Sequence, residues 1–216
     1  MGISNLSVFE ILAGALCLII ALPFHECAHG YVAYRLGDPT AKNMGRLTLN
    51  PFKHIDILGA ISMVFFGIGW AKPVQINPNN FKNPKAGMAI SAAAGPLSNL
   101  LLAYIFMVLY KIVYIFASAM SEVTFSSFLL SLLYYLVVIN ISLTVFNLIP
   151  LPPFDGSRII NYFLPDRLYF KVMEYENYIM IGIFALVFSG VLSKPLTYLS
   201  NFMFNMLDKL TFFLGV

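Results

Sequence analysis

Apolar residues in this chain gather in long uncharged runs that are separated by short polar segments. A run of about 20 apolar residues is the length that an α-helix needs to cross the hydrocarbon of a bilayer. The pattern therefore predicts an all-α polytopic membrane protein, a bundle of about five to six transmembrane helices. The runs cover residues 11–24, 57–71, 86–110, 123–154, 177–193 and about 197–216.

The first helix is expected to begin near Asn5 and Ser7, which are typical capping residues, and to end at Gly37-Asp38-Pro39. The N-terminal residues have no basic region and no small-residue cleavage site after the apolar run. They are therefore predicted to start the first helix and not to form a removed signal peptide.

Two of the runs are ambiguous as membrane spans. Residues 57–71 make an uncharged run of only 15 residues with three glycines, which is short for a spanning helix. The last run contains Asp208 and Lys209, so it is predicted either to span or to lie in the interface. Residues 46–49 and 74–76 are strand-like and are expected to form short β-hairpin-like loops.

Composition supports a membrane protein, because 59% of the residues are hydrophobic and only 11% are charged, against about 25% charged in a soluble domain. We expect residues 1–216 to form a single membrane-embedded domain, with a core at 8–160 and C-terminal helices at 177–216. The 13 basic residues are scattered between apolar runs, which argues against a nucleic-acid partner. Cys17 and Cys27 both lie within the first helix, so no disulfide framework is expected.

The sequence His-Glu-Cys-Ala-His at residues 25–29 carries the most specific chemistry. Residues four apart share one face of a helix, so His25 and His29 can bind one metal ion, with Glu26 beside them to accept a proton from water. The alternative is a set of polar residues at the headgroup level, which would leave a glutamate inside an apolar segment without explanation. The motif therefore indicates metal-assisted hydrolysis.

A catalytic zinc site takes three protein ligands and leaves a fourth position open. Asp155 is the favoured third ligand, because it follows a long apolar run broken by prolines and precedes Gly156, which allows a close backbone turn. The same Asp-Gly pair is equally typical of an ordinary turn after a membrane span. The other candidates beside apolar segments are Glu10, His54, Asp56 and Glu122.

Three motifs taken in order resemble the site-2 protease family of intramembrane zinc metalloproteases. They are HECAH at 25–29, SAAAGPLSN at 91–99 and FNLIPLPPFDGSRI at 146–159. GRLTLNPFKHID and GWAKPV are similar to the small bacterial branch of that family, which has no PDZ or CBS domain. The chain departs from the family at Phe154, where leucine is usual, and this change affects packing more than metal binding.

The resemblance implies one zinc ion (Zn2+) per chain, with His25, His29 and Asp155 as ligands and Glu26 as general base. It also implies that Asn147 lies near the substrate or the oxyanion. His54 is predicted to touch the substrate or support the site, although a histidine at headgroup level is an equal alternative. Gly95-Pro96 and Asn99 are expected to fix close helix packing around the site, or simply to kink a helix.

Three ligands of one metal must lie at the same depth in the membrane. The chain between the first helix and Asp155 must then cross an even number of times, which predicts that residues 57–71 form a re-entrant segment. Ten of the 13 basic residues then lie on the active-site side, which the positive-inside rule makes cytoplasmic. They are Arg35, Lys42, Arg46, Lys53, Lys72, Lys82, Lys85, Arg158, Arg167 and Lys171.

These features predict a zinc endopeptidase of a bacterial inner membrane that cuts a transmembrane protein substrate near the cytoplasmic face of the lipid bilayer. An unwound substrate could pair with the strand-like runs by β-addition. A metal transporter or sensor would need ligands spread along a pathway, and an inactive helix-binding scaffold would not need Glu26. Three histidines cannot supply the ligands of a di-iron hydroxylase. Homo-oligomer formation is left open.

Overall fold

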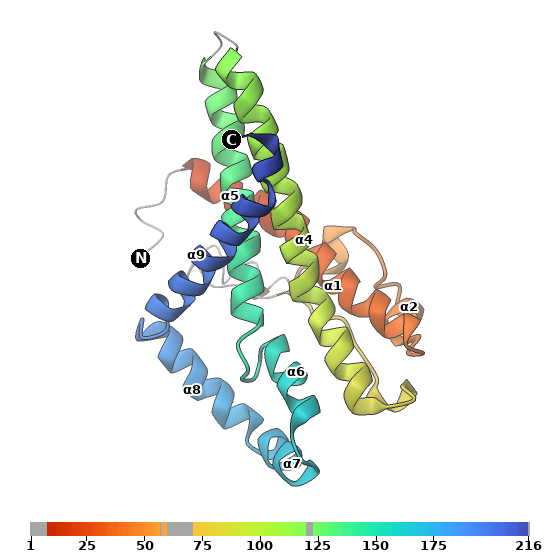
Figure 1. Cartoon of the computed structure of the whole chain (residues 1–216). Coiled ribbons are helices and arrows are strands. Elements are labelled where there is room, and N and C mark those ends of the chain that lie inside the picture. The colour runs from red at the N-terminus through yellow and green to blue at the C-terminus, as the bar shows by residue number, and fades with distance from the viewer. Residues whose placement is uncertain (1–7, 57, 60–70, 120–122, 216) are drawn as a thin grey trace.

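The protein is described from a computed structural model that covers residues 8–56, 58–59, 71–119 and 123–215 (Figure 1). No strand occurs among these residues, so the all-α prediction is confirmed. The α-helices are α1 (Val8–Arg35), α2 (Thr40–Asn43), α4 (Pro84–Ala119), α5 (Val123–Asn147), α6 (Asp155–Phe163), α7 (Asp166–Glu174), α8 (Glu176–Phe188) and α9 (Ser193–Leu210). Short 3-10 turns are η2 (Pro51–Lys53), η3 (Pro78–Asn80) and η4 (Phe212–Leu214).

Three helices in the described ranges are long and apolar enough to cross a membrane. They are 22 residues of α1 (Gly14–Arg35), 34 residues of α4 (Pro84–Ala117) and 22 residues of α5 (Ser126–Asn147). The apolar helix α8 has 13 residues, about 20 Å at the rise of an α-helix, and α9 has 18. The expected total of five to six spans is therefore not established by helix length.

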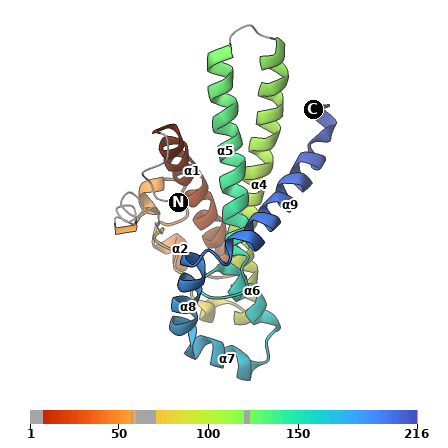
Figure 2. The same ribbon diagram turned by 90° about the vertical axis from the view of Figure 1, so that its left-hand side faces the viewer.

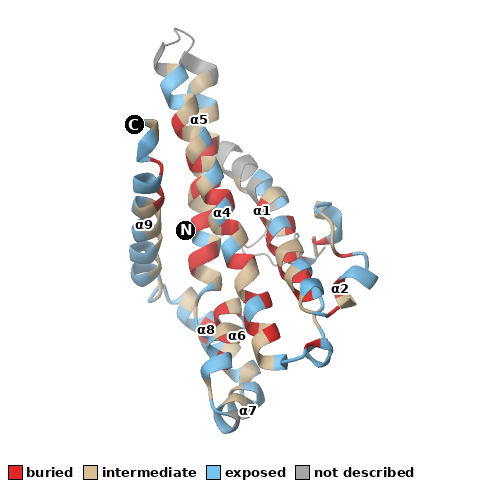
Figure 3. Cartoon of the chain, turned by 45° about the vertical axis from the view of Figure 1, so that its right-hand side comes forward, coloured by how far each residue is buried: buried red, intermediate tan, exposed pale blue. Residues whose placement is uncertain are grey.

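The long helices α4 and α5 form an antiparallel pair, with α9 lying along one side of it (Figure 2). One buried cluster joins this pair to α9 and consists of Ala103, Met107, Val137, Ile141, Val145 and Leu207. A second cluster joins Ala21 of α1 to Leu133 and Leu136 of α5. Buried residues accordingly follow the faces where α1, α4 and α5 meet (Figure 3).

The end of α1 was predicted correctly from the sequence, and the end of α5 was not. As predicted, α1 ends just before Gly37, which has a φ of 110° that favours glycine. The predicted helix over 123–154 is wrong at its end, because α5 stops at Asn147. Prolines lack the N–H that would continue the helix. Asp155 consequently opens α6 and does not end α5.

The strand-like runs 46–49 and 74–76 are not strands, which corrects the expectation of β-hairpin-like loops. The bridge observed here is a single antiparallel pair, Ile55 with Ala71. Side chains hold the segments in place of a ladder, since the Arg46 guanidinium donates to the Lys72 carbonyl. Most of residues 57–71 lie outside the described residues, but Ile55, just before that segment, pairs with Ala71 at its end.

Asp38 ties the end of α1 to η3. Its carboxylate accepts hydrogen bonds from the backbone N–H groups of Thr40 and Asn77 and from the side-chain amide of Asn80. Burial alone raises the pKa of this carboxyl, but the hydrogen bonds from Thr40, Asn80 and Asn77 lower it below its usual range. The ionised form therefore holds the segment that precedes α4 against α1.

Asp208 of α9 has a basic partner within the long helix α4. Lys111 is 5% exposed, and its Nζ lies 2.8 Å from Asp208 Oδ1. The same ammonium donates to the Asp208 carbonyl at 3.1 Å. Of the two charges that weakened the prediction of a final span, the Asp208 carboxylate is thus paired with Lys111 of α4.

Candidate metal centre

His25 and His29 lie one turn apart on α1 and face the same direction. Each residue is 7% exposed, and the two rings meet edge to face with centroids 4.5 Å apart. Their Nε2 atoms are separated by 3.0 Å. The i, i+4 spacing therefore places two imidazole nitrogens at one point, as the sequence predicted.

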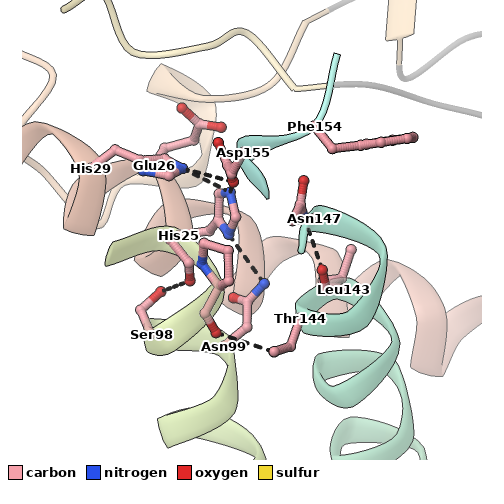
Figure 4. A network of polar contacts seen from close by, with 12 residues as sticks. His25, Glu26, His29, Ser98, Asn99, Leu143, Thr144, Asn147, Phe154 and Asp155 are labelled. Atoms are coloured by element: carbon pink, nitrogen blue, oxygen red, sulfur yellow. Dashed lines mark hydrogen bonds and ion pairs between the residues drawn. The ribbon is translucent and has the colours of Figure 1, made fainter. Parts of the chain in front are cut away.

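Asp155 reaches the same point from α6 (Figure 4). Its Oδ2 lies 3.2 Å from Nε2 of His25 and 3.3 Å from Nε2 of His29. Gly156 makes this approach feasible, because a Cβ there would overlap the backbone of Leu148 and Ile149. The turn after α5 thus folds back closely enough to start α6 at the two histidines.

In the described ranges, the side chains that could together hold a metal ion are those of His25, His29 and Asp155. One ligand atom from each lies within 4.8 Å of the others. Among the rival ligands, the Asp56 carboxylate accepts instead from the N–H of Gly59. Glu122 lies outside the described residues, as does the side chain of Glu10.

The group fits zinc in its chemistry as well as its geometry. Asp155 Oδ2 is buried without a hydrogen-bond partner, although two imidazole nitrogens stand within 3.3 Å of it. Burial by itself raises the pKa of this carboxyl, but His25 and His29 lower it well below its ordinary value, so the group is ionised as a ligand must be. Two imidazoles and one carboxylate are a ligand set of catalytic zinc, with a fourth position left open.

Helix α4 supplies the contacts behind the two histidines. The Nδ1 of His29 lies 2.7 Å from the carbonyl of Ser91, and the Nδ1 of His25 lies 3.2 Å from the side-chain Nδ2 of Asn99. Gly95 faces both rings, and a Cβ at this position would overlap them. The sequence predicted close packing at Gly95 but not the hydrogen-bond partners of the imidazoles.

Helix α5 is fastened to α4 at the same level. The hydroxyl of Thr144 lies 3.1 Å from the carbonyl of Pro96 and 2.9 Å from that of Asn140, and it can donate to either. Thr144 is 1% exposed, so this polar contact lies in the interior between the helices. It fixes the end of α5, and with it the start of the turn that carries Asp155.

Glu26 stands beside the ligands but points to a different partner. It is 8% exposed, and its Oε2 accepts a hydrogen bond of 2.8 Å from the backbone N–H of Val74. This contact cannot be predicted from the sequence, because a backbone donor in a loop has no residue signature. This hydrogen bond orients one oxygen of the Glu26 carboxylate, and its donor is not one of the candidate metal ligands.

The two further predicted site residues, Asn147 and His54, form hydrogen bonds to backbone carbonyls. Asn147 is the last residue of α5, and its side-chain amide nitrogen donates a hydrogen bond of 3.0 Å to the Leu143 carbonyl in the same helix. Figure 4 places Asn147 where the chain turns toward Asp155. His54 is fully buried, with Nε2 2.8 Å from the Thr48 carbonyl. Their roles toward a substrate remain predictions.

Comparison with known proteins agrees with this geometry. Residues 13–189 match Peptidase family M50. The chain is 42% identical over 161 residues to "Putative zinc metalloprotease YwhC" of Bacillus subtilis, covering 74% of this chain and 73% of that protein. It is 29% identical over 163 residues to "Putative zinc metalloprotease MJ0611" of Methanocaldococcus jannaschii, covering 73% and 74% of the two chains.

A longer relative is "Putative zinc metalloprotease Rip3" of Mycobacterium tuberculosis, which is 30% identical over 154 residues. That alignment covers 71% of this chain but 31% of the relative. No solved structure matches the chain. The ligand group and the three apolar helices agree with the family match. The chain therefore belongs to Peptidase family M50, the site-2 protease family of zinc metalloproteases.

Proposed function

We propose that this protein is an intramembrane zinc endopeptidase that cuts transmembrane segments of other membrane proteins near the cytoplasmic face. The observation that carries the proposal is the convergence of His25, His29 and Asp155 at the end of a bundle of apolar helices. The ligand group is mostly buried, and Glu26 stands next to it in the chain. Such a site suits hydrolysis of a peptide bond that reaches it within the membrane.

The catalytic parts follow from the ligand group and its neighbour. Nε2 of His25, Nε2 of His29 and Oδ2 of Asp155 would hold the zinc ion. When bound, zinc lowers the pKa of water and polarises the scissile carbonyl. Glu26 accepts the proton of the attacking water and passes it to the leaving amine nitrogen. The Val74 N–H holds one oxygen of Glu26 and leaves the other to carry that proton.

A substrate has to be unwound before it can be cut, since a helix hides its amides in internal hydrogen bonds. The segment at 72–77 runs beside Glu26 and is a candidate for β-addition. Several of its N–H groups are already used, since Lys72 donates to His54, and Asn77 donates to Asp38. Pairing with a substrate would therefore use the remaining backbone groups, those of Gln75 among them.

Charge supports a cytoplasmic orientation of the site. The end of α1, the start of α4 and the end of α5 meet at the end of the bundle that carries α6 and α7 (Figures 1 and 2). Ten of the 13 basic residues belong to the segments that adjoin this end. The positive-inside rule then favours a site facing the cytoplasm of a bacterial inner membrane.

The proposal can be tested in liposomes that contain the purified protein and a single-span model substrate with a Gly-Pro pair near one end of the span. We expect Glu26→Gln to keep one zinc ion while cleavage falls at least about 100-fold, since general-base catalysis contributes about that much or more. Glu174→Gln makes the same change at an exposed residue of α7 and should cleave like the wild type.

Mass spectrometry of the fragments should place the cut within the apolar segment, near the side that faces the basic residues. Undiminished cleavage by Glu26→Gln would contradict the general-base role. Zinc uptake into the liposomes without any cleavage would favour a transporter over a protease.

A further inference from the structure

The side chain of Asn99 lies directly behind His25. The Nε2 of His25 faces Asp155 and His29 at 3.2 and 3.0 Å, and its Nδ1 faces the Asn99 amide nitrogen at 3.2 Å (Figure 4). Asn99 is 1% exposed, and its Oδ1 is buried without a hydrogen-bond partner. Thus a buried amide with an unpaired oxygen contacts a candidate metal ligand.

The proton on His25 decides whether this imidazole can bind a metal. A neutral imidazole carries one N–H and one lone pair. Metal binding at Nε2 requires the lone pair there, so Nδ1 must carry the proton and donate it to an acceptor. An Asn99 nitrogen facing Nδ1 is a donor, and it matches the tautomer in which Nε2 is protonated and cannot bind metal.

Rotation of the Asn99 amide by half a turn exchanges its oxygen and nitrogen in nearly the same positions. The oxygen would then accept the Nδ1–H of His25 and gain the partner that it lacks. His29 needs no such change, because its Nδ1 faces the carbonyl of Ser91, a backbone group that can only accept. The two histidines therefore differ in how their tautomers are set.

We propose that Asn99 is a positioning residue that selects the tautomer of His25, with its oxygen turned toward Nδ1 when zinc binds at Nε2. This inference rests on the proposed zinc site. The outer partner of a metal-bound histidine is typically worth about 10- to 100-fold in metal affinity. Asn99→Leu keeps the number and branching of the side-chain heavy atoms but removes the acceptor, so zinc affinity should fall by about that factor.

Asn99→Asp separates the acceptor of the side chain from its donor. A carboxylate offers an oxygen in either orientation, so the Nδ1–H of His25 always finds an acceptor, but it has no N–H to donate. Zinc affinity should then be retained or increased, whereas a residue that acts through its amide N–H would weaken zinc binding in Asn99→Asp as well as in Asn99→Leu. Asn140→Leu is a matched control, because Asn140 is fully buried in α5 and donates to Leu136 in its own helix.

The experiment measures zinc dissociation constants of the full-length protein in detergent by competition with a coloured chelator, with the Co2+ absorption spectrum as a second readout. We expect Asn99→Leu to bind about 10- to 100-fold more weakly, and Asn99→Asp and Asn140→Leu to bind at least as tightly as the wild type within about threefold. The Co2+ spectrum should change in Asn99→Leu only. If Asn99→Leu does not fold, Asn99→Ala paired with Asn140→Ala replaces the leucine pair, with the same expected difference.

Wild-type affinity in Asn99→Leu, equal weakening in Asn99→Asp, or equal weakening in Asn140→Leu would each overturn the role of Asn99. A wild type that binds no zinc would overturn both this inference and the proposed function. Zinc binding without proteolysis would overturn the proposed function alone.

Discussion

Gly95→Ala is a sharp perturbation of the metal centre, because it adds a single methyl group between α4 and the two imidazoles. The new Cβ would lie 2.6 Å from Cε1 of His25 and would overlap the Nε2 and Cε1 atoms of His29. Carbon atoms in good contact are about 3.5–4.0 Å apart, so the overlap is about 1 Å. Both rings must therefore move away from α4.

The cost should appear in zinc affinity more than in folding. Overpacking of this kind costs about 1–3 kcal/mol, which corresponds to about 5- to 150-fold in affinity at 1.4 kcal/mol per factor of ten. Without zinc the rings can shift at the expense of their contacts with Ser91, Asn99 and Asp155, and the preference for alanine over glycine inside a helix, about 1 kcal/mol, offsets part of that loss. Zinc binding should thus weaken by more than the thermal stability of the metal-free protein falls.

The assay compares zinc dissociation constants and melting temperatures of wild type, Gly95→Ala and Gly182→Ala. A Cβ at Gly182 of α8 meets nothing within 4 Å, so this control should bind zinc normally and melt at the same or a slightly higher temperature. Unchanged zinc affinity in Gly95→Ala would refute the placement of the two imidazoles against α4.

Three further experiments test other parts of the structure. Metal analysis should show that Asp155→Ala loses zinc along with activity, that Asp155→Asn is intermediate, and that His54→Ala retains zinc. Loss of zinc in His54→Ala with zinc retained in Asp155→Ala would refute the ligand set. Asp208→Asn should lower the free energy of unfolding by about 2 kcal/mol, because buried Lys111 loses this carboxylate and half-exposed Asp208 makes the lost ion pair less costly than a fully buried one. An unchanged denaturation curve would refute this role. The lowered pKa of Asp38 contributes stability above the ordinary carboxyl pKa, and this stability is lost as the pH falls through the lowered pKa. Asp38→Asn should therefore reduce the dependence of the melting temperature on acid pH. An identical pH profile in this variant would contradict the role of Asp38.

The local parts of the site could be predicted from the sequence because helix periodicity fixes them. Once residues 8–35 form a helix, the i, i+4 spacing alone brings His25 and His29 together. Asp155 could be proposed but not selected by local reasoning, because it lies 126 residues beyond His29 and a turn after a span was an equal alternative. Its selection requires the packing of α1, α4 and α5 at one level.

The contacts that orient the site could not be predicted, since they depend on tertiary structure. The carbonyl of Ser91 and the N–H of Val74 are backbone groups that every residue carries. The apolar alternation near residues 46–49 and 74–76 predicted strands, but the side chains of Arg46, Glu26 and Asp38 bind the backbone of the second run or of its flanking residues instead. The prolines at 150–153 indicated a helix break without specifying that α5 ends at Asn147.

The central claim is that two histidines and one aspartate bind a single zinc ion, and X-ray absorption at the zinc edge tests it most directly. On the purified wild-type protein, the account predicts one zinc per chain, with two imidazole nitrogens at about 2.0–2.1 Å and oxygen ligands at about 2.0–2.2 Å. Asp155→Ala should lose most of its zinc. A sulfur shell at about 2.3 Å, which would implicate a cysteine such as Cys27, or a wild-type spectrum that persists unchanged in Asp155→Ala, would contradict the account.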